Sequence, residues 1–148
     1  MSNRVRIALA SMLMVPMVMS ACGGGGESSD EDFVAELCQA VVRLNTDFEA
    51  AIKSASTETD PAKAVEKLIP PIEKFVDAFD DADPPKDLKD WHDSAVTRLE
   101  AAVAKFKEAK TLASLEGFGD SPVPNPAPAE KNRLREAAQN VTECDGVA

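Results

Sequence analysis

Apolar residues recur every three or four positions between Phe33 and Ala55, which is the spacing of one face of an α-helix. Ser28 and Glu31 stand just ahead in the spacing of a capping box. The chain therefore predicts a first helix over residues 33–55, with the apolar stripe Val34, Leu37, Val41, Leu44, Phe48, Ile52 and Ala55.

A second stripe follows a turn at residues 57–59. Asp60 precedes Pro61, a combination typical of an N-cap and the first helical position. The predicted helix extends to about Ala82 with the stripe Val65, Leu68, Ile72, Phe75 and Phe79. Because this stripe stays in phase across Pro70-Pro71, the two prolines indicate a kink and not a chain reversal.

Two further helices complete the pattern. Asp83, ahead of Pro84-Pro85, is expected to cap a third helix that ends near Glu116, with the stripe Leu88, Trp91, Ala95, Leu99, Ala102, Phe106 and Ala109. Residues 117–128 contain alternate prolines and predict an extended surface loop. A shorter helix over residues 129–143 carries Leu134, Ala137, Ala138, Val141 and Cys144 along one side, and no segment alternates with period two.

The start of the chain has a different composition. All five methionines lie at or before position 19, and nearly every charge follows Gly26. Arg4 and Arg6 precede an apolar run over residues 7–19, which is shorter than the roughly 20 residues that span a membrane. This arrangement is typical of a secretory signal peptide.

The signal ends in Met19-Ser20-Ala21-Cys22, which resembles a bacterial lipobox. The resemblance covers this leader only, and it departs from the usual pattern at Met19, where leucine is common. It implies that the Cys22 thiol receives a diacylglycerol, that cleavage precedes Cys22, and that the new amino terminus is often acylated as well. The alternative is an ordinary signal peptide cut near Ala21, which leaves a free thiol.

These segments give the predicted domain organisation. Residues 1–21 are the signal peptide, residues 22–32 are the lipidated cysteine with a glycine-rich, acidic tether, and residues 33–148 are a single helical domain. The protein is then expected outside the cytoplasm, anchored through Cys22 to the plasma membrane, or to the outer membrane if the host has two membranes.

Two cysteines remain in the helical domain. In an exported protein Cys38 and Cys144, on the apolar faces of the first and last helices, are expected to form a disulfide, with two buried free thiols as the alternative. The predicted fold is an all-α, up-down four-helix bundle closed by this bond. In that bundle the disulfide and the turn at residues 80–85 face the membrane, and the proline loop points outward.

Charge and residue types narrow the chemistry. Loss of Arg4 and Arg6 with the leader changes the net charge from −10 to −12, which argues against nucleic acid as a partner. The acidic corner of residues 77–93 offers weak metal candidates in Asp80, Asp81, Asp83 and Asp87 but lacks a calcium-loop pattern, and we expect no metal and no cofactor. His92, the only histidine, is expected at the surface or at its boundary with the core, and no catalytic set accompanies it.

Because no catalytic set is present in the sequence, the function is predicted from the expected location of the protein at the cell envelope. The sequence favours a non-enzymatic interaction or accessory module of the cell envelope that binds another envelope protein. The alternative is a lipoprotein that binds a small ligand in a pocket of the bundle core near the kink at Pro70-Pro71, or a divalent metal at the acidic corner.

Overall fold

The computed structural model describes residues 28–109, 111, 123–145 and 147. Every regular element in these residues is a helix, so the predicted all-helical class is confirmed there. None of these helices is long and apolar enough to span a bilayer. The predicted signal peptide and Cys22 lie outside the described residues, and every contact reported below falls within residues 28–147.

Helix α1 (Asp30–Ala55) begins within the predicted tether, three residues before Phe33. Its cap is Ser29 and not Ser28, because the Ser29 hydroxyl accepts a hydrogen bond from the Asp32 N–H at 3.1 Å. The same hydroxyl donates to the Asp32 carboxylate at 2.7 Å. Three acids in this first turn face the positive end of the helix dipole, which accounts for the earlier start.

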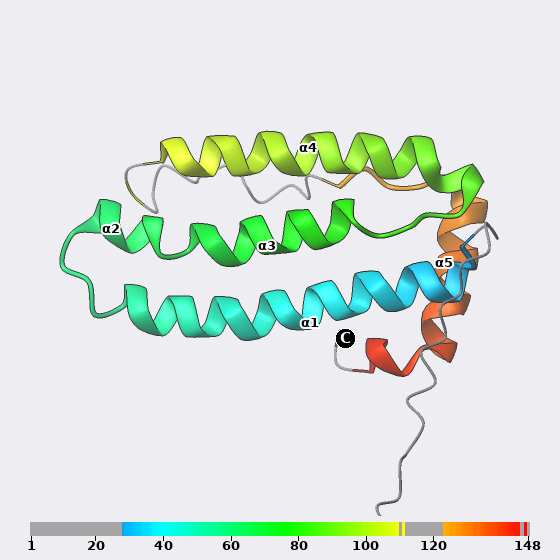
Figure 1. Ribbon diagram of the computed structural model, residues 1–148, viewed down its shortest axis with the longest axis horizontal. Coiled ribbons are helices and arrows are strands. Elements are labelled where there is room, and N and C mark those ends of the chain that lie inside the picture. Colours follow the sequence, from blue (N-terminus) through cyan, green and yellow to red (C-terminus); the bar gives the residue numbers. More distant parts are fainter. Residues whose placement is uncertain (1–27, 110, 112–122, 146, 148) are drawn as a thin grey trace, which may run out of the picture.

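The second predicted helix is two helices, α2 (Pro61–Glu66) and α3 (Ile69–Asp80). Asp60 caps α2 as predicted, since its carboxylate accepts from the Ala62 N–H at 3.0 Å. The predicted kink at Pro70-Pro71 is wrong, because α2 ends at Glu66 and the two prolines lie in the first turn of α3. Proline has no N–H, and the first turn of a helix is the place where missing N–H groups cost least. The chain still does not reverse between α2 and α3 (Figure 1).

A 3₁₀ turn, η1 (Lys86–Leu88), leads directly into α4 (Lys89–Glu108). Asp83 does not cap this helix, contrary to prediction. Its backbone N–H instead donates to the Glu36 carboxylate of α1 at 3.0 Å. Helix α4 ends at Glu108, earlier than the predicted Glu116.

The last helix, α5 (Pro128–Asn140), is followed by a 3₁₀ turn, η3 (Thr142–Cys144). Helices α1, α3 and α4 lie side by side with alternating direction, whereas α5 crosses the end of this layer where α1 and α4 begin (Figure 1). The predicted up-down four-helix bundle is therefore not confirmed, because the fourth helix does not run beside the other three.

An extended segment before α5 explains the difference. Val123 packs against the apolar cluster between α3 and α4, and the Trp91 indole donates to the Pro124 carbonyl at 2.7 Å. Residues 123–127 thus occupy space beside α4 and return the chain to the end where α1 starts (Figure 1). Residues 123–127 of the proline-rich loop therefore run toward the end of the molecule where α1 begins (Figure 1), whereas the loop was expected at the opposite end.

The core consists of three adjoining apolar clusters. The largest joins α3 to α4, the second joins α1 to α5, and the third lies where α1 meets η1. Phe33, Val65 and Leu88 are the largest fully buried side chains. The α1 start, the α5 contact and the turn after α3 are consequently held together at one end of the molecule.

Candidate functional site

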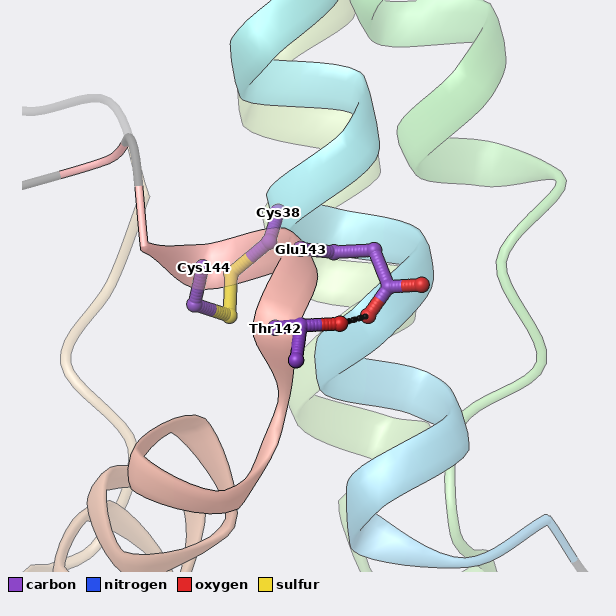
Figure 2. The surroundings of a disulfide bond; sticks show 4 residues. All are labelled: Cys38, Thr142, Glu143 and Cys144. Carbon is purple, nitrogen blue, oxygen red and sulfur yellow. Dashed lines mark hydrogen bonds between the residues drawn. A yellow bond between two sulfur atoms is a disulfide. The ribbon is translucent and has the colours of Figure 1, made fainter.

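Cys38 and Cys144 form the predicted disulfide. The bond joins α1 to η3 across 106 positions of sequence, with the two Cα atoms 5.1 Å apart. It lies beside an apolar cluster that includes Val34, Ala137 and Val141. Figure 2 shows the C-terminal turn held against α1 by this bond, with the Thr142 hydroxyl donating to the Glu143 carboxylate at 3.2 Å on the other side of the turn. The disulfide thus fastens the end of the described chain to α1, the first described helix.

The four weak metal candidates are not brought into one site. Asp80, Asp81 and Asp83 are exposed around the end of α3, and Asp87 turns toward α5. In the part of the chain that the structure describes, no three Asp, Glu, His or Cys side chains are grouped so that they could hold a metal ion. The acidic corner therefore acts through individual contacts.

Asp87 makes the strongest of these contacts. The Arg133 guanidinium of α5 donates to its carboxylate at 2.7 Å and pairs with Asp30 of α1 through Nε at 2.6 Å. The hydrogen bond from Arg133 lowers the pKa of Asp87 below its ordinary value. Arg133 therefore connects α5 to the starts of both α1 and α4.

This pair predicts a pH-dependent contribution to stability. Because the folded pKa of Asp87 is depressed, its contribution is present above the unfolded pKa of about 3.9 and is lost as pH falls through the folded pKa. An Asp87→Asn variant should melt below the unsubstituted protein at about pH 7, and the difference should shrink steadily as the pH falls below about 3.9. Thermal unfolding followed by circular dichroism measures the difference. Glu49→Gln, at an exposed position of α1, is the control and should not reproduce this pH trend.

His92 is buried, with 3% of its surface exposed, so the expectation of a surface histidine is wrong. Its Nε2 lies 2.7 Å from the Phe79 carbonyl oxygen and must carry the proton, because a carbonyl only accepts. The imidazole also stacks on the Phe79 ring at 5.1 Å and meets the edge of Phe33 at 5.7 Å. Phe79 lies in the last turn of α3, where carbonyls lack helical donors, so His92 serves as a cap from a neighbouring helix.

The sequence contained a signal for this burial. His92 follows Leu88 by four positions and precedes Val96 by four, which places it in a helical stripe with two residues that are buried. The predicted stripe passed through Trp91 instead, one position earlier. Its charged neighbours Asp90 and Asp93 made the histidine resemble a surface residue.

A groove with a largely apolar floor lies between α1 and α3. It has a volume of about 380 Å³, and we call it the α1–α3 groove. Its lining combines small and apolar side chains with three charged ones: Ala40, Arg43, Leu44, Asp47, Pro71, Lys74, Phe75 and Ala78. The groove lies beside Pro71, close to the position of the pocket that the sequence predicts. It is formed at the surface of the two helices, whereas the predicted pocket lies in the core of a bundle.

The charges of the α1–α3 groove are not balanced. Lys74 pairs with Asp47 across the groove at 2.9 Å. Arg43 forms no ion pair or hydrogen bond within the described ranges 28–109 and 123–145. One exposed guanidinium without an ion pair thus borders the apolar floor, while Glu36 and Asp81 line the hollow on its other side.

A second hollow lies on the other side of α3, against α4. It is lined by Val76 and Val103 together with Glu73, Asp77, Glu100, Ala104 and Lys107. Lys107 pairs with Glu73, which leaves a net negative rim. The two faces of α3 therefore border grooves of opposite charge.

Comparison with known proteins identifies no relative. No family model, curated protein or solved structure matches the chain.

Proposed function

We propose that the chain is a lipid-anchored extracytoplasmic protein whose helical domain serves as a non-enzymatic interaction or accessory module of the cell envelope. The observation that carries the proposal is the Cys38–Cys144 disulfide. Disulfides form and persist in oxidising compartments, which supports a location outside the cytoplasm. The bond also secures the C-terminal turn to α1, the helix that continues from the tether.

The placement of the titratable groups supports a role without catalysis. His92 is occupied by the Phe79 carbonyl and enclosed by aromatic rings, so it is not positioned to act on a substrate. Asp87 is engaged by Arg133. The chain would then act by presenting a helical surface within reach of the membrane, at a range that the glycine-rich tether sets.

Lipid anchoring predicts that a Cys22→Ala variant leaves the membrane fraction. Without the thiol no diacylglycerol can be attached, and two or more acyl chains are needed for stable anchoring. The measurement is immunoblotting of membrane and soluble fractions after export in a bacterial host with a lipoprotein signal peptidase. A Ser28→Ala variant is the control, since it alters a residue close to Cys22 in the sequence, keeps all three cysteines and should stay bound. Retention of Cys22→Ala in the membrane would refute the anchor.

The interaction role predicts a specific partner in the envelope. Crosslinking of intact cells followed by purification of the protein should enrich at least one envelope protein above an unrelated lipoprotein with the same anchor. Equal recovery with both lipoproteins would count against an interaction module.

The α1–α3 groove favours one second candidate, a lipoprotein that binds a small ligand. Its volume of about 380 Å³ lies within the range of small-molecule sites. Leu44, Pro71 and Phe75 provide the apolar lining that such sites have.

A further inference from the structure

We infer that the α1–α3 groove binds an amphiphilic anion, with a single carboxylate at Arg43 and an unbranched apolar chain along the floor toward Pro71. This inference rests on the second candidate function and does not depend on the lipid anchor. Shape, charge and the contrast with the opposite face of α3 each contribute to it.

The shape of the groove follows from the residues where α1 and α3 approach each other. Ala40 is almost fully buried, and Ala78 faces it from α3. Alanine lets the two helices pack closely but cannot fill the surface above the contact, so a channel remains. From Ala78 to Pro71 the channel extends over seven residues of α3, or about 10 Å at 1.5 Å per residue.

The floor of this channel is apolar. Pro71 is buried, while Leu44 and Phe75 are partly exposed to the channel. Covering such side chains releases about 25 cal/mol for each Å² of apolar surface removed from water. The channel is about 10 Å long. An extended alkyl chain of about eight to ten carbons has a similar length and therefore fits along the floor.

The charge of the groove selects the head group. Lys74 and Asp47 neutralise each other at 2.9 Å, so Arg43 is the charge that a ligand would meet. A guanidinium offers paired N–H donors in a fixed fork that matches the two oxygens of a carboxylate. Arg43 also lines the adjacent hollow between α1 and α3, which contains Glu36 and Asp81. These acids disfavour an anionic head beyond Arg43 and direct the apolar chain toward Pro71.

The opposite face of α3 strengthens the assignment. The hollow between α3 and α4 carries Glu73, Asp77 and Glu100 against a single Lys107. An anion is repelled there, whereas a cationic amphiphile is attracted. The two grooves therefore predict that head-group charge decides which face of α3 is occupied.

The test is calorimetric titration of residues 23–148, which contain all the described elements, with decanoate, decanol and decyltrimethylammonium. Decanoate should bind at one site at least tenfold more tightly than decanol, and binding of decyltrimethylammonium, which the negative rim between α3 and α4 attracts, should not respond to Arg43→Gln. Arg43→Gln should weaken decanoate binding about tenfold or more, and Ala78→Leu should abolish it by filling the floor. Arg98→Gln and Ala101→Leu, at exposed positions of α4, are matched controls that should leave decanoate affinity unchanged.

Two results would overturn the inference in different ways. Equal binding of decanoate and decanol, with no effect of Arg43→Gln, would refute the anionic head while a small-ligand role stands. Absence of binding for all three probes, with circular dichroism showing a folded protein, would refute both the groove ligand and the second candidate function. Neither result bears on the anchor at Cys22.

Discussion

Replacing Cys38 and Cys144 together with alanine is expected to lower the free energy of unfolding by about 4 kcal/mol. The bond closes a loop with a sequence separation of 106, and in the chain-entropy model a loop of about 100 residues contributes close to that amount. The loss should be largest in α5 and η3, which the bond attaches to α1. Urea unfolding followed by circular dichroism measures the change in free energy, and amide hydrogen exchange locates it.

The same experiment contains its own controls. Reduction of the unsubstituted protein with dithiothreitol should reproduce the loss, and reduction of the double variant should change nothing further. A double variant within about 1 kcal/mol of the oxidised protein would contradict a stabilising disulfide.

Replacing His92 with alanine is expected to cost at least about 4 kcal/mol of unfolding free energy. The substitution leaves a cavity between Phe33 and Phe79 and removes the donor from the Phe79 carbonyl. A buried ring lost to alanine costs several kcal/mol, and an orphaned buried carbonyl costs about 1–3 kcal/mol. Urea unfolding at neutral pH measures the difference.

A His92→Phe variant separates the two contributions. It keeps an aromatic ring in the same place but has no donor, so it should cost about 1–2 kcal/mol and fall between the parent and the alanine variant. If His92→Ala unfolds with the same midpoint as the parent, the buried cap described here is incorrect.

The helices were largely predictable because their signals are local. The Asp60-Pro61 pair specifies the start of α2, and the stripe of α1 requires only the spacing of its own apolar residues. The Cys38–Cys144 bond was predictable from the positions of the two cysteines in their helices, once the chain was expected to be exported. None of these predictions required knowledge of how the helices pack.

The arrangement of α5 was not predictable in the same way. An apolar stripe shows which side of a helix is buried but not which helix covers it or at what angle. The crossing depends on Trp91 binding the Pro124 carbonyl and on Val123 entering the α3–α4 cluster, both contacts between distant parts of the chain. His92 was missed for a related reason, since its partner is a carbonyl at the end of another helix.

Only the approximate position of the candidate groove was predictable from the sequence. The prolines at 70 and 71 indicated a local irregularity, and a groove does lie beside Pro71. Its charge could not be predicted, because the pairing of Asp47 with Lys74 and the isolation of Arg43 depend on the register between α1 and α3.

The central claim is that the protein is anchored outside the cytoplasm through Cys22. The most direct test is mass spectrometry of the intact protein extracted from membranes of a lipoprotein-processing host. The account predicts a chain that begins at Cys22 and carries a diacylglycerol, with Cys38 and Cys144 oxidised. A chain that begins elsewhere, or that begins at Cys22 without lipid, would contradict it.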